Sequence, residues 1–158
     1  MNYWGEQINQ EIFNKVKKLL EAQKYAVIAT NKDKIPYTNI IAFASTEGLG
    51  NIYFATKKDS TKFLNLINNP CVSLLIDDRK NLSSDIMNAT AVSVEAEVKE
   101  VNEKKEKLKK ILLEKHPELR GFLNEPNCEL LKLEVKKYYY IDKFDNKQVL
   151  TFENDLVS

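Results

Sequence analysis

The chain has 158 residues, with 24 basic and 23 acidic side chains that leave a formal charge of +1. This length suits one domain of about 100 to 200 residues, so we expect residues 1–158 to form a single domain. A charge balance so close to zero gives no reason to expect nucleic acid or an anionic membrane as the main partner.

The first part of the chain predicts a helix followed by a hairpin. Apolar residues recur at helical spacing over residues 6–23 and predict an amphipathic helix, whose apolar side carries Ile8, Ile12, Phe13, Val16, Leu19 and Leu20. Residues 25–30 and 36–45 are apolar runs on either side of a polar turn, which predicts two antiparallel strands.

The next part predicts a third strand, a short helix and a fourth strand. The strands cover residues 51–56 and 71–76, and the helix covers residues 60–68. The helix ends before Pro70, because a residue that precedes proline is disfavoured in the helical conformation.

The start of this helix, Asp59-Ser60-Thr61-Lys62, suits a phosphate group. The first turn of a helix presents unpaired backbone N–H groups, and hydroxyls and a lysine add donors and positive charge there. The alternative is that Asp59 or Ser60 only caps the helix and that the lysines lie in solvent.

The last part of the chain predicts two longer strands separated by a charged helix. Residues 77–88 form a polar excursion with one helical turn, and residues 89–101 alternate between apolar and polar side chains as a half-exposed strand does. Residues 102–115 predict the charged helix, a short turn covers 117–123, and the sixth strand covers 129–141.

Six strands joined mostly by hairpins predict a mainly β fold with helices, namely an antiparallel barrel. Side chains fill the interior of so small a barrel, so we expect a ligand to bind outside it, at a subunit interface. An aromatic cluster near the C-terminus can supply the walls of that site: Tyr138, Tyr139, Tyr140 and Phe144. Ordinary strand packing is the alternative role of these side chains.

The order of four motifs resembles that of the pyridoxamine 5′-phosphate oxidase-like, FMN-binding split-barrel family. The motifs are YAVIAT, IPYTNIIAF, IYFATKKDSTKFLNLINNPCVSLLID and ATAVSVEAEVKEV. The resemblance covers roughly residues 11–101, and CELLKLEVKKYYYIDKF is similar to the closing strand of shorter members. It implies a six-stranded split barrel that forms a homodimer, with FMN in grooves at the interface.

The resemblance also implies which residues bind FMN. The family's phosphate site matches Ser60, Thr61 and Lys62, where Thr61 replaces an arginine of many members, and Lys57 or Lys58 can supply the missing charge. The remaining positions lie along three strands and contact the isoalloxazine and ribityl groups: Asn39, Ile40, Ile41 and Ala42, then Ala55 and Thr56, and finally Thr90.

Each of these residues also has a simpler interpretation. Ile40, Ile41 and Ala42 are apolar as in any strand, and Thr90 is suited to begin one. Asn39 and Thr56 say more, because polar residues between buried runs need hydrogen-bond partners.

The resemblance favours a cytoplasmic FMN-dependent oxidoreductase that passes electrons between a reduced nicotinamide, or another donor, and a small-molecule substrate. The alternatives are a protein that binds, stores or senses flavin without turnover, and a scaffold for haem or a deazaflavin. Pyridoxamine phosphate oxidation is not expected, because the substrate-binding C-terminal segment of those enzymes has no match here.

The remaining reactive side chains predict no catalytic or metal site. His116 is the only histidine, follows a charged helix and is expected at the surface. Cys71 and Cys128 are far apart and are expected to be reduced, partly buried thiols. No apolar run of about 18 residues occurs, so no membrane span is predicted.

Overall fold

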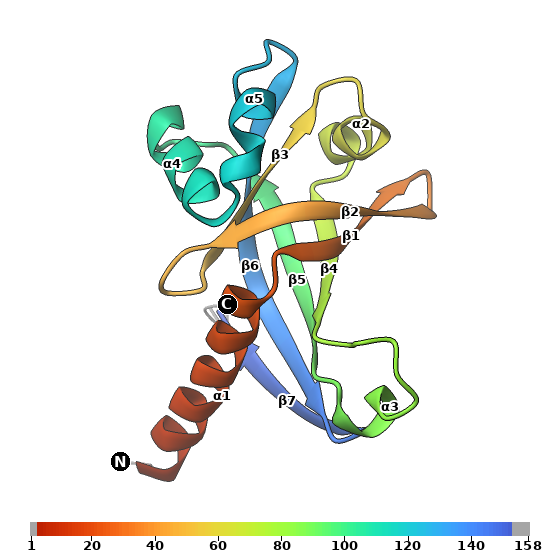
Figure 1. Ribbon diagram of the computed structural model, residues 1–158, viewed down its shortest axis with the longest axis vertical. Coiled ribbons are helices and arrows are strands. Elements are labelled where there is room, and N and C mark those ends of the chain that lie inside the picture. Colours follow the sequence, from red (N-terminus) through yellow and green to blue (C-terminus); the bar gives the residue numbers. More distant parts are fainter. Residues whose placement is uncertain (1–2, 153–158) are drawn as a thin grey trace, which may run out of the picture.

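The computed structural model describes residues 3–152, with side chains from residue 9 onward (Figure 1). The helices are α1 (Tyr3–Ala22), α2 (Thr61–Asn68), α3 (Asp85–Asn88), α4 (Lys105–Lys115), the 3-10 turn η1 (Pro117–Leu119) and α5 (Arg120–Leu123). The strands are β1 (Tyr25–Lys32), β2 (Ile35–Ser45), β3 (Asn51–Lys57), β4 (Cys71–Asp77), β5 (Ala91–Lys99), β6 (Cys128–Asp142) and β7 (Asn146–Thr151).

Six antiparallel strands close into a barrel. Their order is β3-β2-β1-β4-β5-β6, and β6 returns to pair with β3. The predicted split-barrel fold is therefore confirmed. A seventh strand, β7, pairs with the C-terminal part of β6, from Lys137 to Asp142. It was not predicted, because its short sequence NKQVLT has almost no apolar alternation.

The barrel is split where β2 separates from β3. These strands pair only through Phe43–Phe54, Ala44–Tyr53 and Ser45–Ile52, whereas β2 continues along β1 as far as Ile35. Helix α2 lies between β3 and the β1–β2 hairpin (Figure 1). Its buried Asn65 donates a hydrogen bond from Nδ2 to Thr30 Oγ1 of β1 at 3.0 Å. The split and this helix together shape the end of the barrel that carries the predicted phosphate site.

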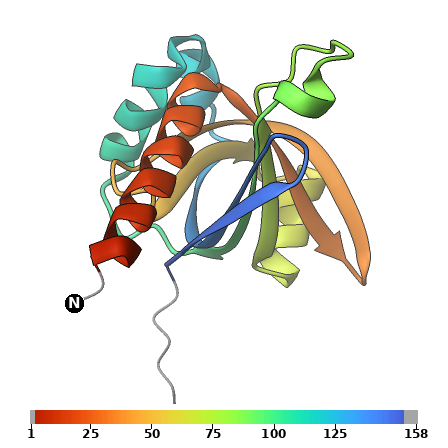
Figure 2. The same cartoon turned by 90° about the horizontal axis from the view of Figure 1, so that it is seen from below.

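Alternating side chains fill the barrel interior, as expected for its size. Val92, Val94 and Ala96 of β5 are buried, as the alternating pattern predicts. Helix α1 runs along one side of the barrel (Figure 2) and contributes Ile12, Val16, Leu19 and Leu20 to this core. The predicted core position of Ile8 lies outside the described side chains.

A second apolar cluster lies outside the barrel, where α4 and α5 cover β2, β3 and β6. Its buried members are Ala44, Tyr53, Leu108, Leu112, Leu123 and Leu130. Strands β2 and β3 are therefore packed on both faces near their pairing region, and they separate immediately beyond it.

The phenol of Tyr138 ties β6 to the turn between β2 and β3. Its hydroxyl donates a hydrogen bond to the carbonyl oxygen of Leu49 at 2.7 Å, and complete burial raises the pKa of Tyr138. Leu49 has a positive φ of 62°, which is uncommon for a residue with a side chain. This bond supplies a partner for a buried carbonyl in a strained turn.

Two predictions about reactive side chains are wrong. His116 is completely buried, because the end of α4 turns inward against β1 and β2 instead of following the surface. Cys71 is exposed at the outward-facing start of β4, whereas Cys128 is partly buried as predicted.

The helix and strand boundaries differ slightly from those predicted. Strand β5 is two residues shorter at each end than the predicted 89–101, and α4 begins at Lys105 instead of residue 102. None of the described helices is long and apolar enough to cross a membrane.

Candidate functional site

The turn from β3 into α2 brings three polar side chains together. Thr56 is the last inward-facing residue of β3 and is 2% exposed. Ser60 is the N-cap residue of α2, and its Oγ accepts a hydrogen bond from the backbone N–H of Phe63 at 3.2 Å. The Thr56 and Ser60 hydroxyl oxygens are 2.9 Å apart, so the end of the strand and the start of the helix are directly linked.

Lys62 completes this cluster from the first turn of α2. Its Nζ donates a hydrogen bond to Thr56 Oγ1 at 3.0 Å. No carboxylate of the described residues forms an ion pair with Lys62, and partial burial lowers the pKa of its amine. We call Thr56, Ser60 and Lys62 the hydroxyl–lysine cluster. Its charge is not neutralised by the described part of the chain, which is the arrangement that an anionic ligand requires.

The two lysines before the cluster are placed differently. Lys57 Nζ lies 3.6 Å from Glu125 Oε2, and Lys58 Nζ lies 3.5 Å from Glu129 Oε2. Both lysines are about half exposed. Glu125 precedes β6 and Glu129 is its second residue, and their proximity to these lysines could not be inferred from the sequence. The predicted role of Lys57 or Lys58 in replacing the missing arginine therefore competes with these ion pairs.

Asn39 carries a buried polar atom that lacks a hydrogen-bond partner among the described residues. It occupies β2 opposite Ile28 of β1, on the same face of the strand as the buried Ile41. Its side-chain Oδ1 is buried and has no hydrogen-bond partner among the described residues. Buried acceptors are normally paired, so this oxygen is suited to receive a hydrogen bond from a bound hydroxyl or N–H group.

The other predicted residues of β2 and β3 and of the start of α2 differ in orientation and exposure. Ile40 is 68% exposed on the outer face, whereas the side chain of Ile41 lies in the core and leaves only its backbone for contacts. Ala42 and Ala55 are half-buried, and Thr61 is exposed at the start of α2.

Thr90 is not brought together with the hydroxyl–lysine cluster. It lies beyond the end of β4, where its N–H donates to Asp78 Oδ1 at 2.7 Å and its carbonyl accepts from the N–H of Asp78. The cluster lies near the other end of β4, and the length of this strand separates the ends by about 20 Å. Thr90 and Lys62 of one chain therefore cannot hold the same phosphate.

The C-terminal aromatic cluster is divided between core and surface. Tyr138 and Tyr140 are buried, which confirms the strand-packing alternative for these two side chains. Tyr139 donates a hydrogen bond to Glu95 on the outside, and Phe144 is exposed in the β6–β7 turn. Only Tyr139 and Phe144 remain as possible walls of a surface site.

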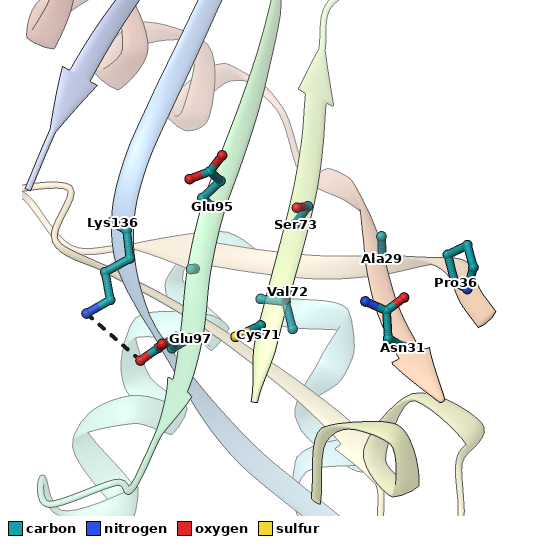
Figure 3. Close-up of a pocket in the computed structure, with 10 residues that line it drawn as sticks. Ala29, Asn31, Pro36, Cys71, Val72, Ser73, Glu95, Glu97 and Lys136 are labelled. Atoms are coloured by element: carbon teal, nitrogen blue, oxygen red, sulfur yellow. Dashed lines mark ion pairs between the residues drawn. The ribbon is translucent and has the colours of Figure 1, made fainter. Parts of the chain in front are cut away.

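A groove of about 490 Å³ crosses the outer surface of β1, β4, β5 and β6 (Figure 3). It is lined by small side chains together with Glu95, Glu97 and Lys136, and Figure 3 shows the ion pair between the last two. None of the predicted cofactor residues lines it. The two carboxylates of this groove repel a phosphate. The hydroxyl–lysine cluster is therefore the better candidate for an anion site, although the groove is large.

Comparisons with known proteins agree with the fold. The family model described as "Pyridoxamine 5'-phosphate oxidase" matches residues 12–142. No curated protein matches the sequence.

Solved structures with this fold have different described functions. General Stress Protein 26 from Bacillus anthracis str. Sterne has a TM-score of 0.69 at 22% identity, over 89% of this chain and 98% of that one. A FAD-binding protein from Mesorhizobium loti has a TM-score of 0.61 at 19% identity, over 79% and 88%. A heme binding protein from Mycobacterium smegmatis has a TM-score of 0.74 at 12% identity, over 85% of this chain and 55% of that one. This chain thus spans about half the length of the Mycobacterium protein.

Lys62 is partly buried without a carboxylate partner among the described residues, which predicts that this residue does not stabilise the ligand-free fold. We expect Lys62→Met to leave the free energy of unfolding unchanged or to raise it by up to about 1 kcal/mol, because the half-buried amine has no carboxylate partner in the part of the chain that the structure describes. Urea denaturation of the ligand-free protein measures this change. Lys58→Met is the matched control and should change the free energy by less than about 0.5 kcal/mol. A loss of more than about 1 kcal/mol in Lys62→Met would show that Lys62 has a structural role.

Proposed function

Because this chain belongs to the pyridoxamine 5′-phosphate oxidase family, we propose that it binds FMN with the phosphate at Thr56, Ser60 and Lys62. The observation that carries this proposal is the half-buried Lys62, whose amine is held by Thr56 and lacks a carboxylate partner among the described residues. A phosphate supplies the missing negative charge and accepts hydrogen bonds from the lysine, the hydroxyls and the first turn of α2.

The residues present fit the remainder of an FMN molecule. Asn39 Oδ1 is a buried acceptor without a partner in the described chain, and the ribityl hydroxyls of FMN are donors. Ile40 offers an exposed apolar side chain on the outer face of the same strand, which suits contact with a flat ring. Thr61 replaces the arginine of many family members, so the phosphate is held by one lysine without a bidentate guanidinium.

A homodimer is part of this proposal. Exposed apolar side chains occur on both α2 and the β1–β2 hairpin, the two elements beside the cluster: Ile35, Tyr37, Leu64 and Ile67. Apolar surface next to a ligand site is typical of an interface. A second copy would also explain how Thr90, which is remote from Lys62 within one chain, could contact the flavin.

Bound FMN would supply electron transfer, which the side chains of this protein cannot perform. The chain would bind the phosphate, orient the ring along β2 and limit the access of water. We propose an oxidoreductase that uses a reduced nicotinamide or another donor and a small acceptor. The second function within the same fold is flavin binding without turnover, as expected of a storage or sensing protein.

The structure gives less support to haem. His116 is the only histidine of the chain, it is completely buried, and its Nε2 is 2.8 Å from the carbonyl oxygen of Phe43. An imidazole ligand for haem would require the end of α4 to leave the barrel.

Substitution of Lys62 tests the position of the phosphate. We expect Lys62→Ala to weaken FMN binding by about 1.5 to 3 kcal/mol, because a charged hydrogen bond to the phosphate is lost, and to change riboflavin binding much less. Fluorescence titration with both ligands measures the difference, and Lys58→Ala is the control. An equal loss for FMN and riboflavin would place the phosphate elsewhere.

Turnover separates the enzyme from the flavin carrier. With FMN bound, we expect NADH or NADPH to bleach the flavin absorption and a quinone or another small acceptor to restore it repeatedly. Stopped-flow absorption measures both half-reactions. Flavin that is tightly bound but not reduced by either donor would support a carrier or sensor.

The dimer can be tested by dilution. If the proposed FMN site needs residues of two chains, dilution below the dimer dissociation constant should release FMN, because association and flavin binding are thermodynamically linked. Analytical ultracentrifugation with absorption detection measures mass and bound flavin together. A species with the mass of one chain that retains FMN would contradict the interface.

A further inference from the structure

A buried hydrogen bond joins helix α2 to strand β1, and the proposed flavin contacts include neither of its residues. Asn65 of α2 is 2% exposed, and Thr30 of β1 is completely buried. Nδ2 of Asn65 donates to Thr30 Oγ1 at 3.0 Å. Removal of either side chain would leave the other buried without this bond, so the pair strongly favours one arrangement of the helix against the strand.

Helix α2 depends on such contacts for its position. It has only eight residues, which is too short for a stable helix in isolation. Its buried side chains are Asn65 and Leu66, whereas Leu64 and Ile67 are exposed. Leu66 contributes apolar packing, which has no preferred direction. The hydrogen bond of Asn65 is directional, and it therefore fixes the rotation of α2 about its own axis and its place along β1.

Lys62 lies on the same side of α2 as this hydrogen bond. It precedes Asn65 by three positions, so the two side chains leave the helix about 60° apart in direction and about 4.5 Å apart along the axis. Lys62 Nζ is bonded to Thr56 of β3 at 3.0 Å. Helix α2 is thus tied to β3 through Lys62 and to β1 through Asn65, and a rotation of the helix would move the lysine away from Thr56.

The same hydrogen bond lies close to Asn39. Asn39 pairs with Ile28 of β1, and Thr30 is the next residue of β1 on the same inward-facing side. Such diagonal neighbours on two antiparallel strands are about 7 to 8 Å apart. Thr30 and Asn65 therefore connect, through β1 and α2, the two groups that the proposed flavin requires. These groups are the buried Oδ1 of Asn39 and the amine of Lys62.

We propose that Asn65 is a positioning residue for the flavin phosphate, which sets the distance between Lys62 and Asn39 through its hydrogen bond to Thr30. One FMN molecule reaches both groups only when they are held at the separation of its phosphate and its ribityl chain. When the pair is broken, each half of the site still binds its part of the ligand, but the gain from binding both parts at once is lost. This inference rests on the proposed FMN site.

Comparison of FMN with riboflavin measures this gain, because the two ligands differ only in the phosphate. We expect Asn65→Leu to weaken FMN binding about fivefold or more and to change riboflavin binding by less than about twofold. Thr30→Val removes the acceptor of the same bond and should have the same effect. Thr30→Ser keeps the acceptor and should keep the FMN affinity within about twofold. Fluorescence titration at constant pH and salt measures each affinity.

Combination with Lys62→Ala distinguishes positioning from general damage to the fold. If Asn65 acts through Lys62, the variant Lys62→Ala/Asn65→Leu should bind FMN within about twofold of Lys62→Ala alone. Additive losses of FMN affinity, or equal losses for FMN and riboflavin, would overturn the proposal, since a residue that only supports the fold produces them. Asn68→Ala changes an exposed asparagine of the same helix and is the control, with both affinities expected within about twofold of the unsubstituted protein.

A variant without either polar group covers the case in which a single substitution prevents folding. Thr30→Val or Asn65→Leu alone leaves one buried polar group unpaired, whereas Thr30→Val/Asn65→Leu leaves neither, and it should therefore fold. This double variant should lose as much FMN affinity as Asn65→Leu. A folded double variant that keeps the full preference for FMN over riboflavin would contradict the positioning role.

The outcomes separate this inference from the proposed function. If the unsubstituted protein binds FMN no better than riboflavin, or if Lys62→Ala leaves the preference intact, the proposed phosphate site fails and the inference fails with it. If Lys62→Ala abolishes the preference but the Asn65 and Thr30 variants retain it, the phosphate site stands and only the role of Asn65 is rejected. Loss of the preference in all of these variants, with riboflavin affinity retained, supports both.

Discussion

The pairing of β3 with β6 is the constraint on which the other features depend. All seven residues of β3, Asn51–Lys57, pair with β6, whereas only three pair with β2. This unequal pairing closes the barrel on one side of β3 and opens it on the other. Because β3 is held to its last residue, Thr56 faces inward at the opening, and the turn that follows returns Ser60 and Lys62 to it. The position of the hydroxyl–lysine cluster is thus a consequence of barrel closure.

The polar residues at this end of the barrel are satisfied to different degrees. Asn65 and Thr30 pair with one another in the buried interface below α2. Lys62 and Asn39 are not satisfied in the same way: among the described residues, Lys62 lacks a carboxylate partner and the buried Oδ1 of Asn39 lacks a donor. Buried polar groups in proteins usually have hydrogen-bond partners, and exceptions are concentrated at functional sites. That two of the predicted cofactor residues are among these exceptions is a stronger argument for a ligand than the identity of either residue alone.

The sequence predicted those features that depend on local patterns. The alternation in β5, the turn before Pro70 and the capping chemistry of Ser60 are local, and the structure confirms them. Features that depend on distant contacts could not be predicted. His116 looks like a surface residue because a charged helix precedes it, and only the packing of α4 against β2 shows its burial. Glu125 and Glu129 pair with Lys57 and Lys58 across about 70 positions of sequence, and β7 pairs with β6 without an apolar pattern of its own. The separation of Thr90 from Lys62 likewise follows from strand direction and length, which motif order does not reveal.

The separation of β2 from β3 also has a consequence for the backbone. From Ile35 to Ala42, β2 is paired with β1 on one side, while its other side has no strand neighbour among the described residues. Such a row of N–H and C=O groups is a template onto which another extended chain can add. If the proposed flavin or second subunit covers this edge, it would also protect the protein from unwanted strand addition.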